Sequence, residues 1–291
     1  MLMSPNTNTT VKLPQSKDGV TIYAEAVGDS LKPSIVFLHG FALSSSVFDG
    51  LFKNAQLLEK FYLVRYDMRG HGRSGKPNTP AAHTSDLYAA DFAVVSQAFS
   101  LTRPVFVGWS LGSAVITDIC ANLHPLPIAG AVALGGSPGI SGEIVPTIAS
   151  PILLSTLPQF NDNTDVSKAL TARVEFVDAL FNEPENVPAS LKYRYLGETV
   201  VQTPDVSTSL SIRPQDPSKL FAAGAQGLPL QLLFGKRDKL VLGEGVLKLV
   251  QPHFKDLTLS FIDGGHALFD DNEKGLVEEL SKFVLRVTAR K

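Results

Sequence analysis

Short runs of apolar residues alternate along the chain with longer segments in which apolar residues recur every three or four positions. The first pattern is typical of strands covered on both faces, and the second of amphipathic helices. The apolar runs predict strands at 20–27, 34–38, 62–66, 105–107, 129–134, 230–234 and 258–262. The helical patterns fall at 47–60, 86–101, 111–123, 243–251 and 272–286. This alternation predicts an α/β fold in which a mostly parallel sheet has helices on both faces.

The alternation stops between residues 139 and 217. Nine of the nineteen prolines lie in this segment or directly before it, and the segment is too long for a structureless loop. Helices are predicted within it at 165–181 and 188–203. We expect the first helix to bury one apolar face, formed by Val166, Leu170, Val174, Val177 and Leu180. The segment 139–217 is therefore predicted to be a helical insertion in a core made of 1–138 and 218–291.

A serine nucleophile is predicted at the junction between a strand and a helix. Ser110 lies in the sequence Gly-Trp-Ser-Leu-Gly, which directly follows the strand 105–107. A serine hydroxyl needs a base to take its proton, and a sharp strand-to-helix turn exposes the hydroxyl to such a base. The amide of Leu111, at the helix N-terminus, would point toward the oxyanion of a tetrahedral intermediate. The motif alone is common, so its position between a strand and a helix carries the prediction.

The chain offers a base and an acid in later loops. His266 follows the strand 258–262 and a Gly-Gly turn, and Asp238 follows the strand 230–234. Both side chains would lie at the carboxyl ends of strands, where ligands bind in open α/β sheets. Asp263 is the other candidate acid, but it ends its strand only three residues before His266 and is poorly placed to orient that ring.

The other histidines have simpler interpretations. His39 and His71 lie in glycine turns and are expected to brace loops. The remaining three lie in polar or proline-flanked contexts with no partner for catalysis, and they are His83, His124 and His253.

Two further motifs make the chain similar to a known family. They are His-Gly-Phe at 39–41 and Asp-Met-Arg-Gly-His-Gly-Arg-Ser at 67–74, each after a predicted strand. Together with the motifs around Ser110, Asp238 and His266, they make the sequence resemble the α/β-hydrolase superfamily, in the branch of cofactor-free haloperoxidase-like proteins and small esterases. The chain order serine, aspartate, histidine is that of the catalytic triad in this superfamily.

The resemblance implies an eight-stranded, mostly parallel sheet and a helical cap at 139–217. It also implies that the amide of Phe41 supplies the oxyanion hole together with that of Leu111. Some relatives take the triad acid from the loop after 129–134, but Gly-Gly-Ser-Pro at 135–138 contains no acid, which favours Asp238.

Differences between this chain and neighbouring families exclude some of the reactions that proteins of this fold catalyse. Epoxide hydrolases and haloalkane dehalogenases of this fold carry an aspartate where this chain has Ser110, so their chemistry is excluded. The triple-glycine oxyanion loop of one group of lipases is absent, because Phe41 and Ala42 follow Gly40.

Composition and charge exclude other functions. The net charge of -2 and the lack of a lysine or arginine run argue against binding to nucleic acid or an anionic membrane. No apolar run approaches the roughly 18 residues of a membrane span, and no secretory signal is found, so a cytoplasmic location is expected.

Cys120, the single cysteine, lies among apolar residues and is interpreted as a small buried side chain. No metal-ligand spacing or phosphate loop is found, so neither metal nor cofactor is expected. The oligomeric state stays open.

The sequence thus predicts a serine hydrolase that cleaves a carboxylic ester, thioester or lactone through an acyl-enzyme on Ser110. The apolar composition of 139–217 favours a small-molecule substrate with a fairly hydrophobic acyl group. Three alternatives use the same pocket: a cofactor-free haloperoxidase or perhydrolase with peroxide as acyl acceptor, a hydrolase of C–C bonds in a diketone, and a receptor for a small ligand. The complete set of Ser110, Asp238 and His266 favours an enzyme over a receptor.

Overall fold

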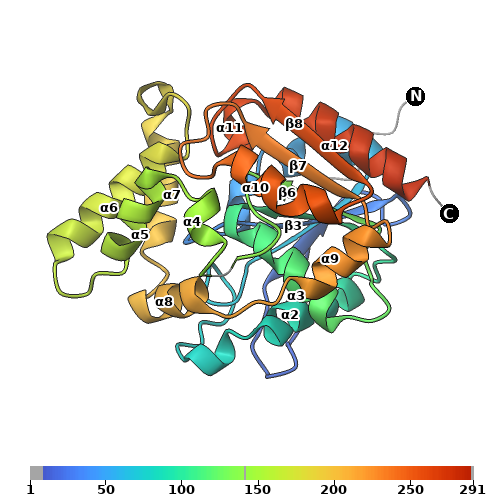
Figure 1. Ribbon diagram of the computed structural model, residues 1–291, viewed down its shortest axis with the longest axis horizontal. Helices are drawn as coiled ribbons and strands as arrows, with labels where there is room; N and C mark the ends of the chain where they lie inside the picture. The colour runs from blue at the N-terminus through green and yellow to red at the C-terminus, as the bar shows by residue number, and fades with distance from the viewer. Residues whose placement is uncertain (1–8, 141, 290–291) are drawn as a thin grey trace.

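The computed structural model of the protein describes residues 9–140 and 142–289 (Figure 1). Eight strands of these residues form one sheet in the order β1-β2-β4-β3-β5-β6-β7-β8. β1 and β2 run antiparallel to their neighbours, and the other strands are parallel. The strands are β1 (Thr10–Lys12), β2 (Ala24–Val27), β3 (Ser34–Leu38), β4 (Tyr62–Tyr66), β5 (Val105–Trp109), β6 (Gly130–Leu134), β7 (Leu230–Gly235) and β8 (Leu257–Ile262). The predicted fold class is confirmed.

Helices cover both faces of the sheet (Figure 1). α2 and α3 pack together on one face with α9 beside them, and α1, α11 and α12 lie together on the other. The α-helices outside residues 139–217 are α1 (Ala55–Lys60), α2 (Ser85–Ala98), α3 (Val115–Asn122), α9 (Ser218–Ala225), α10 (Gly243–Val250), α11 (Leu268–Asp271) and α12 (Glu273–Thr288). Short 3₁₀ helices are η1 (Ser45–Phe48), η2 (Leu51–Lys53), η3 (Pro80–Ala82), η4 (Ser110–Ala114), η5 (Pro184–Asn186) and η6 (Gln251–His253).

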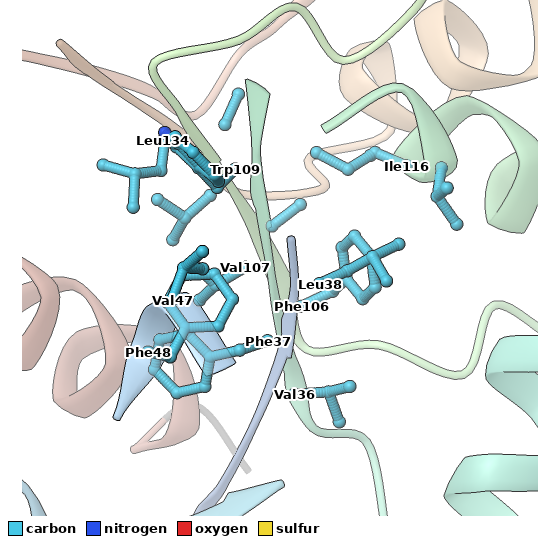
Figure 2. Packing of buried hydrophobic residues seen from close by; sticks show 14 of the residues in the cluster. Val36, Phe37, Leu38, Val47, Phe48, Phe106, Val107, Trp109, Ile116 and Leu134 are labelled. Carbon is cyan, nitrogen blue, oxygen red and sulfur yellow. The ribbon is translucent and has the colours of Figure 1, made fainter. Parts of the chain in front are cut away.

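The central strands carry the hydrophobic core on both sides (Figure 2). Phe37 of β3 packs on Phe48 with ring centroids 5.3 Å apart, whereas Phe106 of β5 points to the opposite side and packs on Phe92 of α2. All four side chains are fully buried. Because successive side chains of a strand point to opposite faces, an uninterrupted apolar run fills both layers. This is why the apolar runs of the sequence predict these strands.

Two local predictions are wrong. The segment 47–60 is predicted as one helix, but η1, η2 and α1 divide it, because Asn54 ends one turn and starts the next helix. The Asn54 side chain accepts the N–H groups of Gln56 and Leu57 at 3.0 and 3.1 Å, as a helix N-cap does. The strand predicted from residue 20 begins only at Ala24. The sequence does not predict β1, because the three residues of this strand are exposed and form no apolar run.

The segment between β6 and α9 is helical, and α5, α6 and α7 lie side by side beyond the end of the sheet (Figure 1). Its helices are α4 (Val145–Ile148), α5 (Pro151–Phe160), α6 (Val166–Ala179), α7 (Ala189–Thr199) and α8 (Pro204–Ile212). α6 and α7 correspond to the two helices predicted here. We call residues 139–217 the insertion. None of the helices within the described residues combines the length and apolarity needed to cross a membrane.

The apolar face predicted for α6 is buried only toward its C-terminal end. Val166, Leu170 and Val174 are 70%, 53% and 46% exposed. The helix instead turns Phe176 toward α5, where its ring lies 5.6 Å from that of Phe160. Burial of this aromatic pair fixes the rotation of the helix, since aromatic rings contribute more buried area than the aliphatic side chains left outside.

Candidate functional site

Ser110 lies in a tight turn between β5 and η4. Its φ is +51°, in the left-handed region that residues other than glycine rarely adopt. The turn also needs Gly112, because a side-chain carbon there would lie 2.5 Å from the carbonyl oxygens of Leu38 and His39. Ser113 Oγ donates to the carbonyl oxygen of Gly108 at 2.6 Å and closes the turn from within. Strain of this kind gathers at functional sites, where the surrounding fold holds it.

His266 and Asp238 form a buried pair at the ends of β8 and β7. His266 Nδ1 lies 2.8 Å from Asp238 Oδ2, and the two side chains are 1% and 3% exposed. Asp238 Oδ1 accepts the N–H groups of Leu240 and Val241 at 2.8 and 3.0 Å. The carboxylate is therefore fixed by the backbone on one oxygen and faces the imidazole with the other. Such a pairing leaves Nε2 of the ring as the nitrogen that can take a proton.

Ser110 and His266 are neighbours across the end of β6. A side-chain carbon on Gly135 would lie 3.3 Å from His266 Nδ1, and one on Gly136 would lie 2.3 Å from the carbonyl oxygen of Ser110. The indole N–H of Trp109 donates to the carbonyl oxygen of His266 at 3.0 Å and ties the serine turn to the histidine loop. Within the described residues no hydrogen bond joins the Ser110 hydroxyl to His266. In enzymes without substrate this bond is often longer than the usual limit.

Two backbone amides lie beside Ser110. Leu111 is the second residue of η4, whose first amides have no partner inside the helix. Phe41 follows β3, and its N–H has no hydrogen-bond partner within the described chain. Both residues line the same cavity as Ser110. Two free donors beside a serine suit an oxyanion hole.

A cavity of about 220 Å³ opens at Ser110. Its walls come from the loops after β3, β5, β6 and β7 and from the insertion helices α4, α5 and α6, including Leu153, Leu157 and Phe176. Ser110 and Ser137 supply its hydroxyl groups, and none of the described residues that line it is charged. An apolar, neutral part of a ligand fits such a cavity.

Within the described residues, no hydrogen bond or ion pair joins the side chain of Asp263, the other candidate acid, to His266. The side chain of Asp263 is 61% exposed and pairs with Arg237 at 3.3 Å.

The histidines interpreted as structural are held by hydrogen bonds. His39 Nε2 accepts the N–H of Met68 at 2.9 Å, and His71 contacts the carbonyl oxygen of Arg69 at 3.1 Å. Burial lowers the pKa of both rings, which favours the neutral form. Burial also raises the pKa of the Cys120 thiol to about 12, in line with a small buried side chain. Within residues 9–140 and 142–289, no cluster of three or more His, Cys, Asp or Glu could hold a metal ion.

Several supporting residues carry no sequence signal. Asp271 Oδ2 accepts the N–H groups of Gly265 and of Asn182 at 2.7 and 2.9 Å, which joins the histidine loop to the insertion. The N–H of Ala267 donates to the carbonyl oxygen of Leu180 at 2.8 Å and adds a second tie. Trp109 could have been suspected from its place before Ser110, but its bond to the histidine loop depends on the fold.

Comparisons with known proteins show the family and the fold of the chain. A family model described as alpha/beta hydrolase fold matches residues 33–273. The chain is 33% identical over 127 residues to a non-heme chloroperoxidase of Streptomyces lividans, covering 43% of this chain and 44% of that protein. It is 36% identical over 127 residues to a bifunctional esterase/perhydrolase of Acinetobacter calcoaceticus, covering 42% and 44%. The chain thus spans less than half the length of these two relatives. The crystal structure of an esterase from Rhodococcus sp. superposes with a TM-score of 0.85 at 27% identity, over 95% of this chain and 99% of that one.

Proposed function

The chain belongs to the α/β hydrolase family, and we propose that it is a serine hydrolase that cleaves carboxylic esters through an acyl-enzyme on Ser110. One observation carries the proposal: the strained turn at Ser110 lies beside the loop of the buried Asp238–His266 pair, and Ser110 itself lines an apolar cavity. Esterase relatives and structural neighbours support the class of reaction.

In the proposed mechanism, Ser110 Oγ attacks the ester carbonyl while His266 Nε2 takes its proton. Asp238 accepts the Nδ1–H of the ring, which fixes its tautomer and stabilises its charged form. The N–H groups of Phe41 and Leu111 stabilise the oxyanion of the tetrahedral intermediate. The protonated His266 then gives its proton to the leaving alcohol, and a water molecule activated by the same ring releases the acid.

The cavity supports a neutral acyl group of limited size. The cavity volume of about 220 Å³ favours an acyl group of short or medium length. A carboxylate in this cavity would lose its hydration without gaining a cationic partner from the residues that line it, which costs several kcal/mol. We therefore expect neutral short to medium acyl chains and weak activity on acyl groups that end in a carboxylate.

Perhydrolysis is the second candidate function, because the relative from Acinetobacter calcoaceticus is a bifunctional esterase/perhydrolase. Peroxide would then replace water as the acceptor of the acyl group on Ser110. The cavity does not separate the two functions, since it holds the acyl group and not the acceptor.

The test is a panel of p-nitrophenyl esters from acetate to dodecanoate, with the hemisuccinate ester as the charged member. We expect kcat/KM to peak at short or medium chains and to be lower by an order of magnitude or more for the charged ester. Peracid formation is measured in parallel with hydrogen peroxide. Ser110→Ala should abolish both reactions. Equal activity of the variant, or a preference for the charged ester, would count against the proposal.

A further inference from the structure

The loop after β3 carries the Phe41 amide of the proposed oxyanion hole and is under strain. We call residues 41–46 the oxyanion loop. Ala42 has φ +59°, in the left-handed region, which costs a non-glycine residue on the order of 1 kcal/mol. The core holds the loop at Ser45, because Asp67 Oδ1 accepts the N–H and the hydroxyl of this residue at 2.9 and 2.5 Å. A strained loop keeps its course only if the residues around Ser45 are held as well.

The insertion holds the oxyanion loop on either side of Ser45. Glu198 of α7 accepts the N–H of Ser44 on Oε2 at 2.7 Å, and its other oxygen accepts the hydroxyl of Ser46. Among the backbone N–H groups of residues 41–44, that of Ser44 alone has a hydrogen-bond partner within the described chain. The carboxylate of Glu198 is therefore the group that holds the backbone N–H of this stretch, at Ser44.

A second contact joins the same two parts of the molecule. The Phe41 ring lies 5.1 Å from that of Phe160 and 6.0 Å from that of Phe176, both in the insertion. The insertion thus packs on the side chain of the residue that presents the proposed oxyanion amide, and Glu198 fixes the backbone three residues later. The two contacts differ in how closely they fix the position of the loop. Ring packing tolerates small shifts, whereas a charge-assisted hydrogen bond to a backbone amide sets a position.

We infer that Glu198 is a positioning residue for the oxyanion hole, so that the insertion contributes to turnover as well as to substrate choice. The inference rests on the proposed function. Glu198 contacts Ser44 and Ser46 and does not line the substrate cavity, so it acts through the loop. If the loop relaxes, the N–H of Phe41 moves away from the oxyanion, and loss of one such donor lowers kcat by about 10²–10³.

Three variants on one ester test the inference. Glu198→Ala should lower kcat on the order of tenfold to a hundredfold with little change in KM, since the donor is misplaced and not removed. Glu198→Gln should restore most of kcat, because its amide can accept from the Ser44 N–H and donate to the Ser46 hydroxyl. Ser46→Ala removes one of the two bonds and should give a smaller loss than Glu198→Ala. Affinity for a trifluoromethyl ketone, which mimics the oxyanion, should fall in proportion to kcat/KM across the series.

The matched control is Arg194→Met on the same helix. Arg194 also bridges the insertion and the core, through Asp49 at 3.1 Å, but this ion pair is partly exposed and lies outside the oxyanion loop. We expect its kcat to stay near that of the wild type.

A Glu198→Ala protein with unchanged kcat, or an equal loss in Arg194→Met, would overturn the inference alone. If Glu198→Ala does not fold, the inference is tested by comparing kcat of Glu198→Gln with kcat of Ser46→Ala. A larger loss of kcat in Glu198→Gln than in Ser46→Ala would overturn the inference. A wild-type protein without Ser110-dependent hydrolysis would overturn the proposed function as well.

Discussion

Asp238 has the most constrained side chain of the proposed site, because one oxygen is fixed by two backbone amides and the other faces His266. We predict that Asp238→Asn lowers kcat by about 10⁴, since the amide can donate to Nδ1 and stabilise the wrong tautomer of the ring. The measurement is steady-state hydrolysis of the preferred ester, with thermal unfolding to show that the fold is kept.

Asp263→Asn is the control for this prediction. Asp263 is exposed and pairs only with Arg237 among the described contacts. An exposed ion pair contributes little, so kcat and stability should stay close to those of the wild type. A greater loss of kcat in Asp263→Asn than in Asp238→Asn would show that Asp238 is not the acid of the site.

Asp67 supports the oxyanion loop from the core, and its effect should depend on pH. Burial opposes its ionised form, but hydrogen bonds from Arg73 and Ser45 hold its pKa at about 2, below the ordinary 3.8. Because the folded-state pKa is depressed, the stabilisation is complete above about pH 4 and is lost as the pH falls through about 2. The difference corresponds to about 2 kcal/mol of unfolding free energy.

We therefore predict that Asp67→Asn lowers the unfolding free energy by about 2 kcal/mol at pH 7, and that the gap narrows toward pH 2. Urea unfolding across this range measures it. Asp86→Asn, which breaks an exposed pair with Lys17, should change stability by well under 1 kcal/mol at any pH. A gap at Asp67 that is independent of pH would contradict the electrostatic explanation.

For single residues, the sequence identifies the reactive side chains of the site but not the residues that position these side chains. Ser110, Asp238 and His266 stand out because each follows a strand and has a reactive side chain. Glu198 and Asp271 follow no such rule, since they accept backbone amides of segments far away in the sequence, those of Ser44 and Asn182. An acidic residue on a helix is usually a solvated one, and only the fold shows which amide it meets.

Among the elements, α6 offers a direct test of whether the insertion shapes the substrate cavity. Phe176 lines the cavity, whereas Phe181, two residues past the end of the helix, stacks on Tyr195 away from it. We predict that Phe176→Ala shifts the preferred ester toward longer acyl chains, because removal of the ring enlarges the cavity. The ester panel with kcat/KM for each chain length measures the shift.

Phe181→Ala is the matched variant, with the same loss of a fully buried ring. It should lower stability by about 3 kcal/mol and leave the order of preference among the esters unchanged. Equal chain-length profiles for Phe176→Ala and the wild type would mean that the core loops alone shape the cavity.

Element boundaries are predicted well where one signal dominates and poorly where two compete. α12 and β7 follow from long amphipathic or apolar runs, and their predicted bounds differ from the observed ones by a residue or two. α5 is absent from the prediction, because Pro151 at its start and Pro158 inside it resemble helix breaks. Pro151 is in fact compatible with the first turn of a helix, where its missing N–H leaves no bond unmade.

For the whole molecule, the eight-stranded, mostly parallel sheet follows from the family resemblance, whereas the contacts of the insertion with the core do not follow from its sequence. Its helices meet the core through contacts such as the Arg213–Asp118 ion pair, which is buried at 2.7 Å, and the bond from Ser44 to Glu198. These contacts join residues about 95 and 154 positions apart. Local patterns predict that a helix forms there, but not which loop it will hold.

In the proposed reaction, Ser110 forms a covalent intermediate with the help of His266. The most direct test is incubation with a fluorophosphonate, followed by mass spectrometry of the intact protein and of its peptides. We predict a single adduct on the peptide that contains Ser110, its absence in Ser110→Ala, and much slower labelling of His266→Ala, because the hydroxyl then lacks its base. An unlabelled wild-type protein, or an adduct that persists in Ser110→Ala, would contradict the claim.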